Sequence, residues 1–167
     1  MIEYRTAIGQ DSHRFEEQDA LTGLSKPLIL AGVLIPGMPG LLGNSDADVV
    51  FHALTNAISG ISCVNILGAV SDEMCFDRSI RDSREYVAAA LKTLGGYMPV
   101  HLSFSIECRR PKISPFIEEM RKSIAGVTDL PCDSIGITAT SGEGLTDFGR
   151  GLGIQVLCII TVKKELP

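Results

Sequence analysis

The sequence predicts an α/β protein of the layered α+β kind, in which helices cover one face of a small mixed β-sheet. Stretches typical of strands alternate with stretches typical of helices, and residues 100–107 alternate cleanly between apolar and polar side chains. The 167 residues, 45% of them hydrophobic, are enough to build a sizeable core. Because no repeat or linker interrupts the chain, we expect one domain over residues 1–167.

The N-terminal third is expected to form two strands and one helix. The first strand covers residues 4–8 and leads into a turn at residues 11–13, and a polar loop follows over 16–26. Residues 28–35 are apolar throughout, which predicts a strand buried on both faces. Ser45 is a good helix N-cap with Asp48 in the capping-box position, and the helix should end near Ile61.

The rest of the chain is expected to alternate helices and strands. Residues 66–80 show no clean period, the next helix opens at 82–85, and Gly95–Gly96 can end it with a left-handed cap. Strand 100–107 places His101 on its polar side, so we expect His101 to be exposed. A third helix begins at Ser114–Pro115 and buries three side chains at helical spacing, and strands at 135–139 and 154–162 flank a glycine-rich loop. The three core positions are Ile117, Met120 and Ile124.

Composition narrows the classes of partner. The net charge is −5 and the only tight basic cluster is Arg109, Arg110 and Lys112, which disfavours a nucleic-acid partner. The longest apolar run, 154–162, is half of a membrane span and contains Gln155, so we expect no membrane segment. Five cysteines without C-x-x-C spacing favour reduced thiols and a cytoplasmic location over a disulfide framework.

Asp11, His13 and His52 form a candidate metal site. Asp11 and His13 are two residues apart, so their side chains leave an extended chain on the same face. A catalytic zinc site uses three protein ligands and keeps a fourth position open, and His52 on the predicted helix is a plausible third ligand. Asp48 precedes His52 by four residues and could orient its imidazole, although an ordinary surface pair would have the same spacing.

Several segments, taken together, resemble the 2-C-methyl-D-erythritol 2,4-cyclodiphosphate synthase family of the non-mevalonate isoprenoid pathway. The resemblance runs nearly from end to end, and it is specific because the segments occur in this order and at these separations. The segments are Asp11-x-His13, Asn44-Ser45-Asp46-Ala47-Asp48 with His52, Asp82-Ser83-Arg84-Glu85, Arg110-Pro111-Lys112, Ala139-Thr140-Ser141-Gly142-Glu143-Gly144-Leu145 and Gly149-Arg150-Gly151.

The resemblance implies an activity and an assembly. The family's members are homotrimers whose sheets face the threefold axis and whose active sites lie between neighbouring subunits. They cyclise 4-diphosphocytidyl-2-C-methyl-D-erythritol 2-phosphate: the 2-phosphate attacks the β-phosphate and CMP is expelled. The implied zinc ligands are Asp11, His13 and His52, and Glu143 would hold a second cation, magnesium or manganese. The partners are therefore a small nucleotide substrate and two further copies of the chain, in a bacterial cytoplasm.

The resemblance also assigns substrate contacts. Two residues would support the transition state, Asn44 and Ser141. The cytidine pocket would use mainly backbone at Cys108, Pro111, Lys112, Ile113 and Ser114. The other substrate contacts would come from Asn44, Ser45, Gly68, Asp72, Glu73, Thr140, Ser141 and Arg150.

Four positions depart from the family pattern. Asn44 stands where histidine is usual and Ser141 where threonine is usual, and each keeps a group that can hydrogen-bond to phosphate. The loop that contacts the methylerythritol loses its leading carboxylate at Ile66, so Asp72 or Glu73 would have to substitute. Leu152 replaces an acid in the Gly-Arg-Gly-Glu-Gly segment. A divergent branch with the same activity explains these changes better than a new activity.

The implied reaction needs cations more than a nucleophilic side chain. It brings a phosphate dianion against an anionic diphosphate, and each pair of unit charges at ~4 Å costs about 1 kcal/mol in water and about 4 kcal/mol at an effective dielectric of 20. Bound metals offset this repulsion, and positioning supplies most of the remaining catalysis. Two alternatives stay open: a metal-dependent phosphohydrolase that activates water, and a non-catalytic oligomer that binds nucleotide or isoprenoid phosphate.

Overall fold

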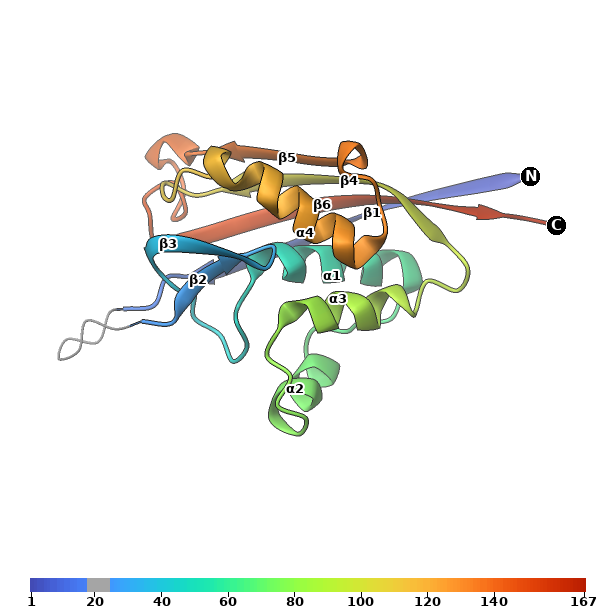
Figure 1. Cartoon of the computed structure of the whole chain (residues 1–167), viewed down its shortest axis with the longest axis horizontal. Helices are drawn as coiled ribbons and strands as arrows, with labels where there is room; N and C mark the ends of the chain where they lie inside the picture. The colour runs from blue at the N-terminus through green and yellow to red at the C-terminus, as the bar shows by residue number, and fades with distance from the viewer. Residues whose placement is uncertain (18–24) are drawn as a thin grey trace.

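The computed structural model describes residues 1–17 and 25–167, so the predicted loop 16–26 falls largely outside the described residues. This part of the chain forms six strands, four α-helices and three short 3₁₀ turns (Figure 1). The strands are β1 (Ile2–Arg14), β2 (Pro27–Leu30), β3 (Val33–Pro39), β4 (Met98–Glu107), β5 (Ile135–Thr140) and β6 (Gly153–Glu165). The helices are α1 (Val49–Ser62), α2 (Ala69–Phe76), α3 (Ser83–Leu91) and α4 (Ile117–Thr128).

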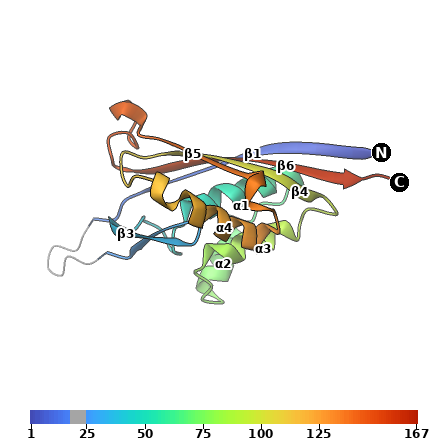
Figure 2. The ribbon, with the colours of Figure 1, turned by 45° about the horizontal axis from the view of Figure 1, so that its top comes forward.

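The main sheet is mixed and carries its helices on one face. Its strand order is β1-β6-β4-β5, with β6 antiparallel to both neighbours and β4 parallel to β5. Figure 2 shows the sheet almost edge-on, with α1, α3 and α4 on the same side of it. The predicted mixed α/β class is therefore confirmed.

Alternating side chains explain why one face is covered and the other is open. In β4, Leu102, Phe104 and Ile106 are buried while His101, Ser103 and Ser105 are exposed, as the apolar–polar alternation predicts. In β6, residues 154, 156, 158, 160 and 162 are buried, and Ile159 on the opposite face is 43% exposed. Ile8 of β1 adds to this open face and is 62% exposed.

Gly9 lets helix α1 pack directly against strand β1. A Cβ atom at Gly9 would lie 2.2 Å from the carbonyl oxygen of Ala53 and 2.2 Å from the amide nitrogen of Ala57, so only glycine permits this approach. The short distance between the two backbones brings His52, on the turn of α1 next to Ala53, close to the following residues of β1.

Two predictions for the first third of the chain are wrong. Strand β1 continues to Arg14, so Asp11 and His13 lie within the strand and not in a turn. Residues 28–35 do not form one strand buried on both faces. They form the hairpin of β2 and β3, with Ala31 (φ 51°) and Gly32 (φ 71°) in the turn and Leu34 60% exposed. An uninterrupted apolar run hides this reversal, because Ala31 is not a typical turn residue.

The predicted start of the first helix is also wrong. Asp48, and not Ser45, is the N-cap of α1, and its carboxylate accepts hydrogen bonds from the amides of Val50 and Phe51. The same buried carboxylate accepts from the amides of Ala31 and Gly32 at 2.8 and 2.5 Å. Asp48 therefore joins the hairpin turn to the helix. Its carbonyl oxygen accepts from the His52 amide at 2.9 Å, but its carboxylate has no hydrogen bond with the His52 imidazole, which corrects its predicted role as the partner of that ring.

The remaining elements follow the predictions with shifted boundaries. Residues 66–80, for which no period was evident, contain α2, whose amphipathic character is weak because only Met74 and Cys75 are buried. Helix α3 begins after the N-cap Asp82 as expected, but ends at Leu91, four residues before Gly95. The third predicted helix begins as a 3₁₀ turn over Ser114–Phe116 and continues as α4.

Candidate active site

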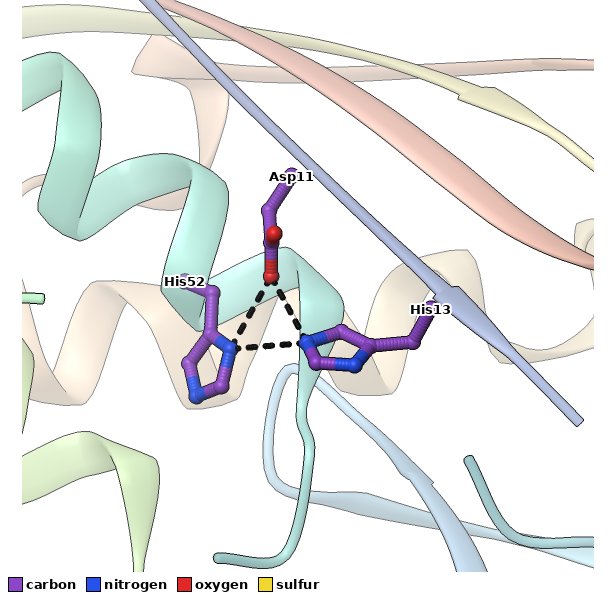
Figure 3. Close-up of side chains that lie close together, drawn as sticks. All are labelled: Asp11, His13 and His52. Carbon is purple, nitrogen blue, oxygen red and sulfur yellow. Dashed lines mark hydrogen bonds and ion pairs between the residues drawn. The ribbon is translucent and has the colours of Figure 1, made fainter. Parts of the chain in front are cut away.

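Three side chains converge where β1 meets the first turns of α1. The Oδ2 atom of Asp11 lies 2.9 Å from Nε2 of His13 and 3.0 Å from Nδ1 of His52. The two histidine nitrogens are 3.2 Å apart, and Figure 3 shows all three ligand atoms directed at one another. These are the three residues that the sequence predicts as metal ligands, and the structure brings them together as one group.

The donor set fits a divalent cation. Two imidazole nitrogens and one carboxylate oxygen are common zinc ligands, and at metal–ligand distances of ~2.0–2.2 Å their atoms lie roughly 3.4 Å apart. The observed separations of 2.9, 3.0 and 3.2 Å need to widen by only a few tenths of an ångström. Three ligands leave one tetrahedral position for water or substrate.

Hydrogen bonds decide which nitrogen of His13 is available. Its Nδ1 lies 2.6 Å from the carbonyl oxygen of Leu42, which can only accept, so Nδ1 carries the proton. The neutral ring then has its lone pair on Nε2, the atom directed at Asp11 and His52. This backbone contact is typical of metal-binding histidines.

The charges of Asp11 and His13 influence each other's pKa values. Burial disfavours the Asp11 carboxylate, but hydrogen bonds with His13, in its protonated form, and with His52 outweigh burial and lower the pKa of Asp11 to about 2. Burial likewise disfavours a charged His13, but the hydrogen bond to Asp11 and its charge raise the pKa of His13. An anionic carboxylate beside two imidazoles is an electrostatic environment suited to a cation.

A second set of predicted residues surrounds a cavity of about 190 Å³ at the ends of β4 and β5. All five predicted cytidine contacts line it, from Cys108 to Ser114, together with Thr140 and Ser141. An adjoining cavity of about 350 Å³ is lined by Arg109, Ser141, Glu143, Gly144 and Gly149. The two cavities share Arg109 and Ser141, and Ser141 donates a hydrogen bond to Glu143 at 3.0 Å.

The other predicted substrate contacts lie elsewhere. Asn44 and Ser45 precede α1, and the thiol of Cys75 on α2 contacts the carbonyl oxygen of Asn44 at 3.4 Å. Gly68 is the N-cap of α2, and Asp72 and Glu73 lie on that helix. Glu73 pairs with Arg78 at 2.6 Å and lines a separate cavity. Arg150 is exposed and pairs with Asp147 at 2.5 Å.

The hydrogen-bond partners of the candidate metal ligands could not be predicted from the sequence. The Nε2 atom of His52 lies 2.9 Å from Oγ of Ser83, which is hydrogen-bonded to Asp46. Ser83 and Asp46 both lie in segments that support the family resemblance. Ser83 is 31 residues from His52 and 37 residues from Asp46, so no local sequence pattern would pair them. From the sequence, Arg109 is recognisable only as part of a basic cluster, because its position between the two cavities depends on the fold.

The triad and the two cavities occupy opposite edges of the same sheet. Asp11 and His13 are on the edge strand β1, and His52 is on the helix α1 that packs against it. The cavities adjoin the edge strand β5, and β6 and β4 lie between the two edges. Three strand spacings amount to roughly 14 Å. Within a single copy of the chain, the width of the sheet therefore separates the Asp-His-His triad from the two cavities.

Fold and site together define a class of protein: a small mixed-sheet domain with an Asp-His-His group that could hold a metal ion and a separate pocket lined largely by loop residues. Residues 4–163 match the model of the YgbB family, and the chain belongs to that family.

Curated relatives match over nearly the full length. A protein of Chlamydia caviae is 49% identical over 96% of this chain and 90% of its own length, and one of Chlamydia trachomatis serovar L2b is 47% identical over 96% and 89%. Both are named 2-C-methyl-D-erythritol 2,4-cyclodiphosphate synthase.

Solved structures share the fold. The bifunctional IspDF of Campylobacter jejuni superimposes with a TM-score of 0.85 and 30% identity over 99% of this chain, which spans 43% of that longer protein. A 2C-methyl-D-erythritol-2,4-cyclodiphosphate synthase in its CDP-bound form superimposes with a TM-score of 0.76 and 29% identity, over 95% of this chain and 99% of the other.

Proposed function

We propose that this chain is a metal-dependent phosphorus–oxygen lyase that cyclises 4-diphosphocytidyl-2-C-methyl-D-erythritol 2-phosphate to 2-C-methyl-D-erythritol 2,4-cyclodiphosphate and releases CMP. The observation that carries this proposal is the convergence of Asp11, His13 and His52, in a chain whose relatives at 49% and 47% identity bear the name of that synthase. The reaction serves the non-mevalonate route to isoprenoid precursors.

The metal ligands have separate tasks in this proposal. Asp11, His13 and His52 would hold zinc, and Glu143 would hold magnesium or manganese together with the substrate's diphosphate. When bound, the two cations would offset the repulsion between the attacking 2-phosphate and the diphosphate. Ser141 donates to the Glu143 carboxylate at 3.0 Å, so its hydroxyl would lie beside the same phosphate groups.

Backbone groups would recognise the cytosine base. Cys108, Arg109 and residues 111–114 line the smaller cavity. Burial keeps the Cys108 thiol protonated by raising its pKa to about 11, so this thiol is no nucleophile near neutral pH. Thr140 and Ser141 lie at the other wall of the cavity and would contact the ribose or the phosphates.

The remaining predicted contacts would act on the methylerythritol and its 2-phosphate. Asn44 and Ser45 precede α1, where backbone amides and side chains can donate to a phosphate. Gly68, Asp72 and Glu73 would approach from α2, and Arg150 from the loop before β6. For Glu73 this requires release from Arg78, with which it forms an exposed ion pair.

The distance between the triad and the two cavities favours a site assembled from more than one copy of the chain. Because the triad and the cavities lie on opposite edges of the sheet, a complete site would combine the triad of one subunit with the pocket of its neighbour. The open sheet face, with Ile8 62% and Ile159 43% exposed, would face the threefold axis of a homotrimer. Each copy would contribute residues 1–167 as a single domain.

The state of the cysteines supports the proposal of a cytoplasmic bacterial enzyme. All five cysteines are free thiols, as expected in a reducing compartment. Within the described residues, no helix has the length and apolar character needed to cross a membrane.

One assay distinguishes this function from its alternatives. The purified protein is incubated with the cytidine-diphospho substrate, zinc and magnesium, and the phosphorus products are followed by NMR. A synthase releases CMP and a cyclic diphosphate in equal amounts. Inorganic phosphate or an uncyclised product would identify a phosphohydrolase. Binding of the substrate without turnover would identify a non-catalytic binding oligomer.

A further inference from the structure

Ser83 is a buried hydroxyl between a metal ligand and a carboxylate. It is the first residue of α3 and has no exposed surface. Its Oγ atom lies 2.9 Å from Nε2 of His52 and also hydrogen-bonds to Oδ1 of Asp46. The backbone amide of Ser83 donates to the other oxygen, Oδ2, of the same carboxylate at 3.1 Å.

The donors and acceptors in this group can be arranged in only one consistent way when His52 binds a metal. Its Nδ1 faces Asp11 and His13, and a nitrogen that ligates a cation carries no proton. The neutral imidazole therefore has its proton on Nε2 and donates it to Oγ of Ser83. The serine hydroxyl is then free to donate to the Asp46 carboxylate, which can only accept.

We propose that Ser83 and Asp46 are positioning residues of the metal centre: a chain from the Asp46 carboxylate through the Ser83 hydroxyl to His52 Nε2 fixes the tautomer and the ring orientation of that ligand. The proposal rests on the metal centre proposed above. An acceptor on the outer nitrogen also makes the imidazole a better electron donor to the metal.

Asp46 links this chain to the segment before α1. Its amide donates to the carbonyl oxygen of Arg81 at 3.0 Å, and its Oδ1 accepts from the amide of Asp48 at 3.2 Å. Asp46 is therefore bonded to both sides of the junction between residues 44–48 and α3. The contacts of Asp46 that orient His52 therefore also fix the backbone of Asn44 and Ser45, the segment proposed above to contact phosphate.

The matched control is Asp82, the neighbour of Ser83. Its side chain caps α3 by accepting from the amide of Arg84 at 2.9 Å and has no contact with His52. A purely structural role of Ser83 in α3 would be disturbed equally by Asp82→Ala. If Ser83 positions the ligand His52, Ser83→Ala should weaken zinc binding and Asp82→Ala should not.

The experiment measures zinc affinity by competition with a chromophoric chelator, with thermal unfolding of the same samples as the check on folding. Ser83→Ala and Asp46→Asn are each expected to weaken zinc binding on the order of 10- to 100-fold, while Asp82→Ala binds zinc as the unchanged protein does. Cobalt substituted for zinc reports the ligand field directly. Its visible spectrum should change in Ser83→Ala and stay the same in Asp82→Ala.

Three results would overturn the proposal. These are wild-type zinc affinity in both Ser83→Ala and Asp46→Asn, an equal loss in Asp82→Ala, and an unaltered cobalt spectrum in Ser83→Ala. If Ser83→Ala does not fold, Asp46→Asn decides, since it keeps the size and one acceptor oxygen of the side chain. If the proposed metal centre is wrong, the result is different: the unchanged protein itself binds no zinc.

A second, independent observation concerns Arg109, which lines both cavities. Its amide donates to the carbonyl oxygen of Phe148 at 3.0 Å, and its Cδ atom lies 3.4 Å from where a Cβ at Gly151 would be. Its backbone and its aliphatic stem are thus both held against the 148–151 loop. Within residues 1–17 and 25–167, the guanidinium has no carboxylate partner.

The geometry points to Arg109 as a phosphate-binding residue for the nucleotide. This inference deepens the proposed function and rests on it. A nucleoside in the smaller cavity directs its phosphates toward the shared wall formed by Arg109 and Ser141, beyond which lies Glu143. A guanidinium there can donate two hydrogen bonds to one phosphate group and partly offset its charge.

Binding of cytidine, CMP and CDP, measured by calorimetry, tests this role. Arg109→Gln should weaken CMP and CDP binding on the order of tenfold and leave cytidine binding unchanged, and Arg109→Lys should recover part of the loss. Arg110→Gln, a neighbouring charge outside both cavities, is the control and should bind all three as before. Unchanged CDP affinity in Arg109→Gln, or an equal loss in Arg110→Gln, would refute it. Absence of CMP and CDP binding to the unchanged protein would instead contradict the proposed function.

Discussion

The Nδ1 atom of His52 lies 3.0 Å from Oδ2 of Asp11, although 41 residues separate them in the chain. This contact joins helix α1 to strand β1 and orients both side chains toward His13. If the group is a zinc site, His52→Ala should abolish stoichiometric zinc binding and activity without unfolding the protein, because the imidazole is at the end of the helix-to-strand interface and not in the apolar core. Metal analysis after dialysis, with circular dichroism as the folding check, measures this.

His101→Ala is the control for that experiment, because His101 is an exposed histidine on the other face of the sheet. It should keep its zinc. Stoichiometric zinc in His52→Ala would remove this residue from the ligand set.

Glu143→Gln should separate the two metals. The substitution keeps the shape of the side chain but removes the charge that would hold magnesium, so the concentration of magnesium needed for half-maximal activity should rise while zinc content stays at one per subunit. The hydrogen bond from Ser141 at 3.0 Å can be kept by the amide oxygen. Glu119→Gln, an exposed acid on α4, is the matched control, and a loss of zinc in Glu143→Gln would place this residue in the other metal site.

Asn44→His restores the residue usual at this position in the family. Asn44 is exposed at the start of the segment before α1, so a larger ring fits without repacking. We expect turnover to be maintained or increased, since an imidazole also donates to phosphate and can carry a positive charge. Steady-state release of CMP measures it. A large loss of turnover would mean that this branch of the family uses position 44 differently.

Gly9→Ala should destabilise the fold by about 3 kcal/mol, because the added methyl group would meet the backbone of α1 and neither strand nor helix can move without opening the interface. A Cβ there lies 2.2 Å from the carbonyl oxygen of Ala53, whereas one at Gly126 in α4 meets nothing within 4 Å. Gly126→Ala is therefore the control and should be neutral or stabilise the protein by roughly 0.5–1 kcal/mol. Urea unfolding of both variants gives the comparison, and equal stabilities would contradict the packing described for Gly9.

Native thiol labelling should distinguish the cysteines by exposure and pKa. Cys63 is exposed, whereas burial raises the pKa of Cys108 to about 11 from a usual value near 9. A pKa two units above the usual value leaves about a hundredfold less thiolate at pH 8, so Cys108 should react with iodoacetamide far more slowly than Cys63. The labelling rate of Cys108 should keep rising at pH values where an ordinary thiol is already fully ionised. Peptide mass spectrometry at several pH values follows both sites. Bound CMP should slow Cys108 further if the base occupies the smaller cavity.

Local patterns predicted much of the fold. The alternation in 100–107 placed β4 and its exposed His101, and helical spacing placed Met120 and Ile124 in the core. The reversal at Ala31–Gly32 and helix α2 were not predictable in this way. The apolar run 28–35 is uniform across the turn, and α2 buries too few side chains to give a period.

Sequence alone determined the three candidate metal ligands, because Asp11, His13 and His52 have side chains that bind divalent cations and lie at separations that a strand and a helix can bring together. Only the tertiary structure decided what supports them. Asp48 has the helical spacing to pair with His52, yet its carboxylate is used by four backbone amides, and Ser83 with Asp46 takes that place. Spacing along a helix shows which side chains share a face. Which of them meet depends on competition for hydrogen-bond partners that only the folded chain brings within reach.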